Sequence, residues 1–180
     1  MTDLFEPNVA WKPSRAEGLR RIRAFAPKSA RSYAARRNYD LGPGRHSAVS
    51  CLSPYLRHRL VTEAEVVAQV LGHHTYDAAE KFIQEVFWRS YFKGWLEQRP
   101  SVWERYRRDR DRLLSETGLD YDAAISGKTG IDCFDHWVTE LVETGYVHNH
   151  ARMWFACIWI FTLRLPWQLG ADFFMQHLMD

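Results

Sequence analysis

The chain has 180 residues, of which 46% are apolar, so it is long enough to bury one sizeable core, and disorder over most of its length is excluded. The net charge of +2 conceals an asymmetry: residues 1–59 hold 12 Lys and Arg against 4 Asp and Glu, and the remainder holds 12 against 18. A basic leading third permits contact with phosphates, and a solvated basic face is the alternative interpretation.

The distribution of cysteines and apolar residues predicts the compartment. Cys51, Cys133 and Cys157 stand far apart, which is typical of reduced thiols in the cytosol. The amino terminus lacks the basic and apolar runs of a signal peptide. The longest apolar stretch, residues 153–165, contains Arg164 and is too short to cross a bilayer. We therefore expect a cytoplasmic protein that does not enter a membrane.

Three helix starts are predicted by a hydroxyl residue followed three positions later by a glutamate. In such a capping box the two side chains satisfy free backbone N–H groups reciprocally. The pairs are Ser14 with Glu17, Thr62 with Glu65, and Ser101 with Glu104.

A loop is predicted between the first two of these helices. Residues 40–44 read Asp-Leu-Gly-Pro-Gly, which forbids a continuous helix and lets the backbone approach a ligand closely. Ser53 and Pro54 then predict a new helix, with the serine as N-cap and the proline at the first helical position. Free N–H groups and the hydroxyls of Ser50 and Ser53 favour an anion site, although serines that only cap a helix give the same pattern.

Residues 77–98 form the longest predicted helix. Their spacing places Glu85, Trp88, Arg89 and Phe92 on one face of that helix. The conservative interpretation is an ion pair between the acid and the arginine beside core aromatic residues. An arginine flanked by aromatic residues in an apolar helix is more often buried, and a buried guanidinium needs an anion.

Further helices are predicted in the second half of the chain. Residues 105–112 alternate in charge and indicate an exposed helix face, and the apolar repeat over residues 134–142 ends at Gly145, a typical helix stop. Residues 149–165 are apolar on nearly every side and predict a central, buried helix. Because no stretch alternates with period two, the predicted fold class is all-α.

Polar residues open the most hydrophobic of these helices. Asn149, His150 and Arg152 stand there and must be satisfied either by the protein or by a ligand. His148 and His150 have no cysteine or carboxylate beside them at ligand spacing, so we predict no metal site.

In their order along the chain, these pieces resemble the family of DNA photolyases and cryptochromes. The matching pieces are Tyr39, Ser50–Ser53, Glu85–Arg89, Gly127–Gly130, Thr144–Met153 and Trp167–Asp180. The resemblance divides the chain into a helical lead-in, residues 1–30, and an FAD-binding helical domain, residues 31–180. Compared with the family pattern, we expect the amino-terminal α/β antenna domain to be absent and the helical domain to be incomplete at its carboxyl end.

The resemblance implies FAD as the cofactor and gives individual residues a role. Contacts with FAD are implied for Tyr39, Ser50, Leu52, Ser53, Phe82, Arg89, Asn149, Arg152 and Asp180, with Asp180 paired to Arg152. Contacts with an extruded pyrimidine dimer are implied for Glu85, Trp88, Asn149, His150 and Met153. Of these, Glu85, Asn149 and Met153 are the candidate catalytic residues, and Trp167 matches an electron-transfer position.

Two functions follow from the resemblance: light-dependent electron transfer in the repair of damaged DNA, and blue-light sensing. It leaves open whether the protein is a deoxyribodipyrimidine photo-lyase, and we expect this chain alone to be inactive because the family's last segment is missing. The alternative is a cofactor-free helical module for DNA binding or assembly, which the basic first third favours. The sequence leaves the oligomeric state open.

Overall fold

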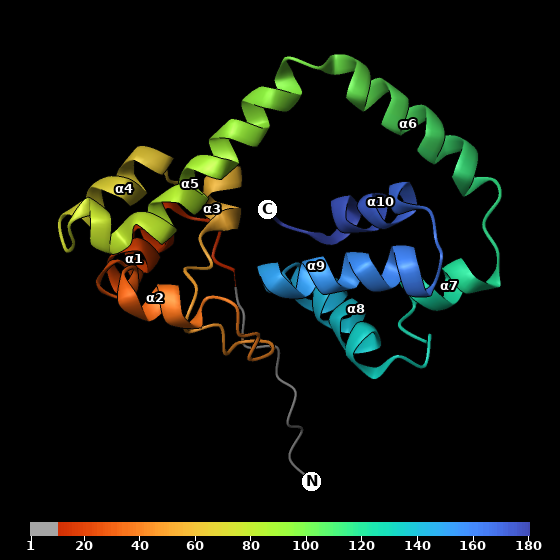
Figure 1. Cartoon of the computed structure of the whole chain (residues 1–180), viewed down its shortest axis with the longest axis horizontal. Helices are drawn as coiled ribbons and strands as arrows, with labels where there is room; N and C mark the ends of the chain where they lie inside the picture. Colours follow the sequence, from red (N-terminus) through yellow and green to blue (C-terminus); the bar gives the residue numbers. More distant parts are fainter. Residues whose placement is uncertain (1–10) are drawn as a thin grey trace, which may run out of the picture. The chain divides into compact units, whose positions relative to one another are not determined.

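A computed structural model describes residues 11–180, and these residues form helices and loops without a β-strand (Figure 1). The predicted all-α fold class is thereby confirmed. The elements are α1 (Arg15–Phe25), the 3₁₀ turn η1 (Ala26–Lys28), α2 (Arg31–Arg36), α3 (Ser53–Arg57), α4 (Glu63–Leu71), α5 (Tyr76–Glu97), α6 (Pro100–Leu114), α7 (Leu119–Ile125), α8 (Asp132–Thr144), α9 (Asn149–Cys157), the π-helical turn η2 (Ile158–Thr162) and α10 (Trp167–His177).

Packing divides the described residues into two compact units. The amino-terminal unit comprises residues 11–97 together with 179–180, and the carboxyl-terminal unit comprises residues 98–178. This division reflects packing alone, so the domain boundary expected between residues 30 and 31 stays a prediction.

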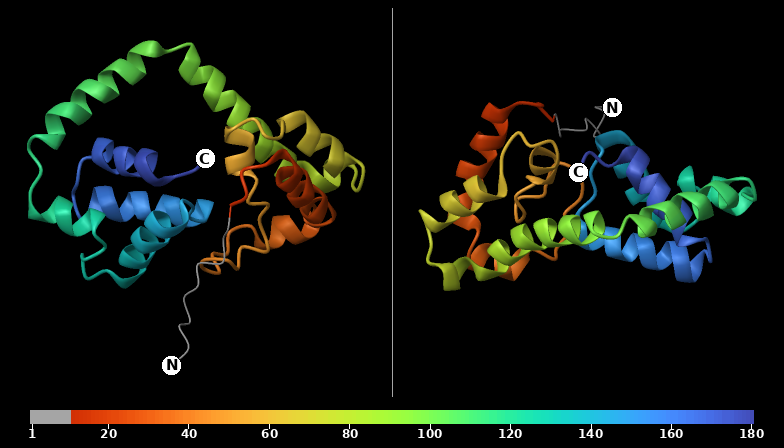
Figure 2. Two further views of the ribbon diagram at one scale, coloured as in Figure 1. Left: turned by 180° about the vertical axis from the view of Figure 1, so that it is seen from behind. Right: turned by 90° about the horizontal axis from the view of Figure 1, so that it is seen from above.

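The core of the amino-terminal unit forms where α1, α2 and α4 pack together with the first half of α5 (Figure 2). At its centre, the ring of Phe82 lies 5.0 Å from the ring of Phe25 and 5.1 Å from that of Tyr33. The second half of α5 leaves the unit's core, and its aromatic side chains are exposed. They are Phe87, Trp88, Tyr91, Phe92 and Trp95. The first half of α5 is therefore fixed by packing, and the second half carries an aromatic surface.

Two of the predicted helix caps are present in this unit. The box of Thr62 and Glu65 is complete, with both reciprocal hydrogen bonds made. Ser14 Oγ accepts from the Glu17 N–H at 3.2 Å, whereas the Glu17 carboxylate pairs with arginines of its own helix. Both helices consequently start where the sequence predicts.

Two other predicted caps are wrong, one by two residues and one by a single residue. The helix expected to start with Ser101 begins at Pro100 with Arg99 as its N-cap and no side-chain cap, because a proline suits the first helical turn without needing one. Likewise Leu52, and not Ser53, is the N-cap of α3, and Ser53 is the first helical residue. No side chain caps α3, and Ser50 Oγ instead accepts from the Leu52 N–H at 3.4 Å in the loop before the helix.

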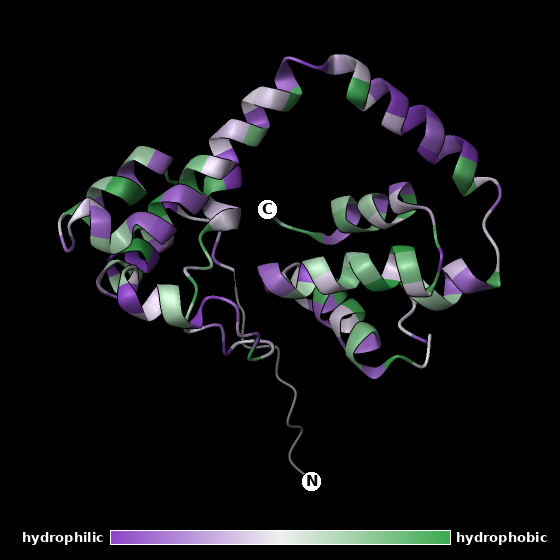
Figure 3. Ribbon diagram, viewed as in Figure 1, coloured by the Kyte–Doolittle hydropathy of each residue, from purple (hydrophilic) through white to green (hydrophobic). Residues whose placement is uncertain are grey.

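In the carboxyl-terminal unit, α10 packs against α6 and against η2. α8 ends as predicted, with Gly145 in the left-handed conformation at φ 66°. Figure 3 shows that α6 is mostly hydrophilic, as expected for its charged stretch, and that α9 and η2 are mostly hydrophobic. The unit's core accordingly lies on the side of α8, α9, η2 and α10.

The helix expected over residues 149–165 differs from the prediction in two ways. It is α-helical only as far as Cys157 and then continues as the π-helical turn. It is also not buried on every side, because Met153 is 58% exposed and Phe161 is 75% exposed. The core lies against only one face of this helix, the face that carries Phe155 and Trp159.

Two glycines of the amino-terminal unit give opposite predictions for substitution by alanine. A Cβ at Gly18 in α1 would lie 2.8 Å from Val61 Cγ1, which belongs to a stiff, fully buried side chain, whereas a Cβ at Gly94 in α5 would meet nothing within 4 Å. We expect Gly18→Ala to destabilise the protein by about 1–2 kcal/mol through overpacking. Gly94→Ala should stabilise it by about 0.5–1 kcal/mol through backbone entropy. Urea unfolding followed by circular dichroism measures the change in the free energy of unfolding for both variants. Changes of the same sign would contradict the packing around α1.

A second prediction concerns acid stability. The pKa of Glu65 is lowered to about 2, first by its hydrogen bond from Arg15 and then by those from Thr62. A depressed carboxyl pKa stabilises the fold above the ordinary value of 4.5, and this contribution disappears as the pH falls toward 2. Glu65→Gln removes the titrating group, so its unfolding midpoint in urea should decline less steeply over that pH window than the midpoint of the wild type. Parallel pH profiles would contradict this coupling.

Candidate functional site

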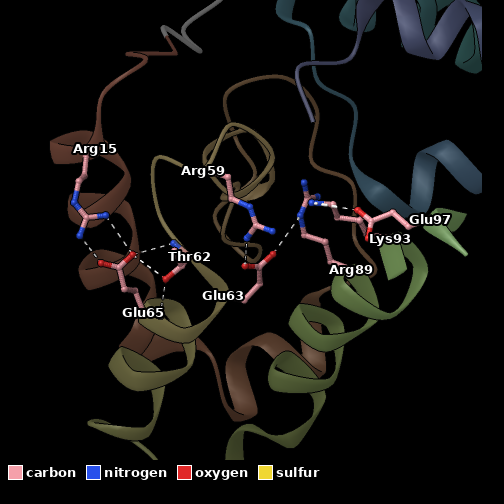
Figure 4. A network of polar contacts seen from close by, with 8 residues as sticks. All are labelled: Arg15, Arg59, Thr62, Glu63, Glu65, Arg89, Lys93 and Glu97. Atoms are coloured by element: carbon pink, nitrogen blue, oxygen red, sulfur yellow. Dashed lines mark hydrogen bonds and ion pairs between the residues drawn. The ribbon is translucent and has the colours of Figure 1, made fainter. Parts of the chain in front are cut away.

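Arg89 lies on α5 at the edge of the amino-terminal unit's core, where its guanidinium shares a carboxylate with a second arginine (Figure 4). Its Nε atom is 3.9 Å from Oε1 of Glu63, and Oε2 of the same carboxylate accepts from Arg59 Nη1 at 2.6 Å. The Arg89 side chain is 29% exposed and that of Glu63 is 18% exposed. The partly buried cation of Arg89 therefore shares the carboxylate of Glu63 with Arg59.

The electrostatics around Arg89 leave an excess of positive charge. Burial lowers the pKa of Arg89, Asp180 and Glu63 act in the opposite direction, and Arg57 and Arg59 add to the lowering. A guanidinium stays charged despite such shifts. With three arginines against two carboxylates, this corner of the unit is suited to an anionic or strongly polar ligand.

Glu85 and Trp88 belong to the same helix but have different surroundings. The Glu85 carboxylate pairs with Arg37, which follows α2, and the Arg37 guanidinium lies 5.9 Å from the centre of the Tyr33 ring. The ion pair between Glu85 and Arg89 that the sequence suggested is thus not formed. Glu85 pairs with Arg37 instead, and Arg89 lies beside Glu63. Trp88 is 50% exposed and stacks with its neighbours on α5.

Two of the predicted cofactor contacts have their side chains in the core. Leu52 and Phe82 are buried in the amino-terminal unit, where they pack among other apolar residues. A contact of Leu52 with a ligand would therefore use its backbone. Their predicted roles toward FAD stay predictions.

The loop before α3 has the backbone conformations expected of a segment that approaches a ligand. Gly42 and Gly44 have φ of 82° and 70°, and Cys51, between the two predicted phosphate contacts Ser50 and Leu52, has φ of 48°. Asp40 Oδ1 accepts from the Gly42 N–H at 3.0 Å and closes the turn. The loop is held in a defined, strained conformation.

A basic hollow of about 240 Å³ lies against this loop. It is lined by Arg20, Arg21, Ala24, Phe25, Lys28, Ser47, Val49 and Ser50. Cations and hydroxyls are the groups that bind phosphate. Arg20 and Arg21 pair with Glu17, so Lys28 and the serine hydroxyls are the lining groups without such an ion pair that suit an anion. Tyr39 and Ser53, the other predicted contacts here, stand on either side of the same loop.

In the carboxyl-terminal unit, the predicted residues gather at the first turn of α9. His148 caps this helix, its Nδ1 accepting from the His150 N–H at 3.2 Å, and Asn149 is exposed. Arg152 Nε donates to the Val147 carbonyl at 2.8 Å, and Met153 is exposed. The Val147 carbonyl therefore accepts one hydrogen bond from Arg152, and the side chains of Asn149 and Met153 are exposed to solvent.

Trp167 begins α10 and is half exposed. Its ring lies 5.8 Å from that of Tyr106, which in turn stacks at 5.4 Å on the ring of Trp103. The predicted electron-transfer residue is thus part of an aromatic row in the carboxyl-terminal unit.

Residues 11–180 contain no group of three or more His, Cys, Asp or Glu side chains arranged to hold a metal ion. Within the same range, no helix has the length and apolar character needed to span a membrane.

The predicted residues are divided between the two units. One set, in the amino-terminal unit, contains Tyr39, Ser50, Leu52, Ser53, Phe82, Glu85, Trp88, Arg89 and Asp180; the other contains Asn149, His150, Arg152, Met153 and Trp167. Because Arg152 and Asp180 belong to different units, their pairing stays a prediction. Sequence reasoning missed Glu63, Arg59 and Arg37, which hold predicted residues.

Comparison with known proteins decides the family. A family model described as the FAD binding domain of DNA photolyase matches residues 82–180. The chain belongs to this family. The match confirms the resemblance derived from the sequence and FAD as the cofactor of this kind of domain.

Relatives of the photolyase and cryptochrome family cover most of the chain. It is 27% identical over 178 residues to a deoxyribodipyrimidine photo-lyase of Neurospora crassa, covering 94% of the chain and 29% of that protein. It is 30% identical to a cryptochrome DASH of Natronomonas pharaonis, with 91% and 35% covered. The crystal structure of a class III photolyase from Agrobacterium tumefaciens matches with a TM-score of 0.76 and 25% identity, over 94% of the chain and 36% of the photolyase. The chain spans about a third of the length of these relatives.

The strained loop of the amino-terminal unit gives a prediction for Cys51. A β-branched side chain is poorly tolerated at φ of 48°, so Cys51→Val should destabilise the protein by about 1–2 kcal/mol. For Cys51→Gly, relief of strain and loss of backbone entropy oppose each other, and the change should stay within about 0.5 kcal/mol.

Cys133→Val is the control for Cys51→Val, because Cys133 is exposed on α8 with helical geometry and should lose only a few tenths of a kcal/mol, about the difference in helix propensity. Urea unfolding measures all three variants. Equal losses for the two valine variants would show that the left-handed conformation costs nothing.

Proposed function

We propose that this chain is the FAD-binding helical part of a light-dependent photolyase-like or cryptochrome-like flavoprotein. The observation that carries the proposal is the partly buried Arg89 in a region of excess positive charge, within the segment that matches the FAD-binding family. A partly buried guanidinium is stabilised by fixed anionic or polar groups, and the shared Glu63 supplies some of them.

The residues that would hold FAD come from several segments of the sequence. Tyr39, Ser50, Leu52 and Ser53 would hold its phosphates and ribose, Phe82 and Arg89 would flank it, and Asn149, Arg152 and Asp180 would lie beside the flavin. When bound, FAD supplies light absorption and one-electron chemistry. The protein's own residues bind the cofactor, orient it and set the charge around it.

We further propose damaged DNA as the partner of the exposed residues near this site. Glu85, Trp88, His150 and Met153 would contact an extruded pyrimidine dimer, with Glu85, Asn149 and Met153 acting on it. Trp88 is half exposed, and an exposed aromatic ring is suited to stacking on a base. The name deoxyribodipyrimidine photo-lyase borne by the Neurospora crassa relative supports repair, and the cryptochrome DASH relative supports light sensing.

The family match disfavours the alternative function, a helical module without a cofactor. The cytoplasmic location expected from the sequence and electron transfer through Trp167 stay predictions.

Arg89 provides the test of cofactor binding. Arg89→Ala removes one side of a charge-assisted contact, which typically costs about 1.5–3 kcal/mol, or roughly tenfold to a hundredfold in affinity for FAD. Arg108→Ala, on the hydrophilic helix α6, removes an exposed arginine and should change the affinity little. Titration of both variants with FAD, followed by flavin fluorescence, measures the difference.

Two outcomes of the titration would argue against the proposal. Equal losses for the two arginine variants would mean that only overall charge matters. A folded Arg89→Ala variant that binds FAD as tightly as the wild type would mean that the cofactor does not meet this guanidinium.

A further inference from the structure

Glu63 lies in the first turn of α4 and faces α5, with one carboxylate oxygen toward each of two arginines (Figure 4). Arg59 donates to Oε2 at 2.6 Å, and Arg89 Nε lies 3.9 Å from Oε1. Asp180 and Glu63 both act on the charge of Arg89, and Glu63 is the one that belongs to a neighbouring helix. The position of this guanidinium thus depends on a residue of a different helix.

Charge explains why such a carboxylate is needed. Arg57 and Arg59 lie close enough to Arg89 to oppose its positive charge. Asp180 and Glu63 counter this repulsion, so the loss of Glu63 leaves less negative charge against the two neighbouring cations and weakens the hold on the flexible Arg89 side chain. With Glu63 present, the same side chain is held over the surface of the unit.

The backbone around Arg59 also serves this arrangement. Arg59 adopts the left-handed conformation, with φ of 55°, directly after α3. A non-glycine residue in this conformation is strained and persists only where its surroundings hold it in place. Here the strained conformation coincides with an ion pair to Glu63, so the end of α3 and the start of α4 are locked to each other through the carboxylate that also faces Arg89.

From this arrangement we propose that Glu63 is the positioning residue of Arg89: the attraction of its carboxylate keeps the guanidinium beside α4, where the cation can meet bound FAD. The proposal rests on the proposed function, in which Arg89 meets the cofactor. At 3.9 Å the contact is an ion pair without a hydrogen bond, so the guanidinium keeps its donors for phosphate and carbonyl oxygens. Glu63 itself contacts no ligand in this arrangement.

The test compares Glu63→Gln with Glu65→Gln in the full chain, using FAD as the probe. Both glutamates lie on α4 and both pair with an arginine, but Glu65 pairs with Arg15, which has no predicted contact with the cofactor. We expect Glu63→Gln to weaken FAD binding by about threefold to tenfold. Glu65→Gln should bind like the wild type, and Glu63→Asp, which keeps the carboxylate, should recover part of the loss.

A double variant shows whether the effect passes through Arg89. If it does, Glu63→Gln should add no loss of FAD affinity once Arg89→Ala is present. Full additivity of the two losses, or equal losses for Glu63→Gln and Glu65→Gln, would overturn the proposal. Circular dichroism confirms that each variant is folded before titration.

A measurement without FAD separates this proposal from the proposed function. The Nε signal of Arg89 in the NMR spectrum should have the same chemical shift in the wild type and in Glu65→Gln, and it should shift in Glu63→Gln, because the nearby negative charge is lost. A wild type that binds no FAD but shows this pattern would overturn the proposed function and support the positioning of Arg89. Identical Arg89 signals in all three proteins would overturn the positioning role, whatever the cofactor does.

Discussion

The partial removal of Arg89 from water is the constraint around which the amino-terminal unit is organised. A guanidinium at the edge of an aromatic core must be balanced, and the balancing carboxylate comes from the start of the neighbouring helix. That requirement couples the cap of α4, the strained end of α3 and the packing of α4 on α5 into one arrangement. The two arginines and the carboxylate between them therefore tie three helices to a single electrostatic centre.

The sequence predicts one member of this centre, Arg89, but not Glu63 or Arg59. Helical spacing identified Arg89 and its aromatic neighbours, because residues three and four positions apart share a face. Glu63 was overlooked for a physical reason: an acidic residue directly after the capping Thr62 is what any helix dipole favours, so its tertiary partners leave no trace in the pattern. Arg59 carries no local signal either, since positive φ in a non-glycine residue follows from the surrounding structure.

The carboxyl-terminal unit shows a different limit. The stop of α8 at Gly145 followed from residue chemistry alone. The helix over residues 149–165 was expected to be buried all round, because apolar side chains on every face usually mean complete burial. Composition does not reveal which face is covered within the unit, and Met153 and Phe161 stand on a face that is not. The apolar pattern of these residues also did not predict the π-helical geometry after Cys157.

The pairing of Glu85 with Arg37 gives the exposed side of α5 a selective character. Any molecule that engages Glu85 must displace a cation that already occupies it, so a hydrogen-bond donor alone gains little from the exchange. A molecule that offers a donor to the carboxylate and an anion to the released guanidinium exchanges both halves of the pair at once. Such a site selects molecules that carry both complementary groups. A molecule with only one of them does not separate Glu85 from Arg37.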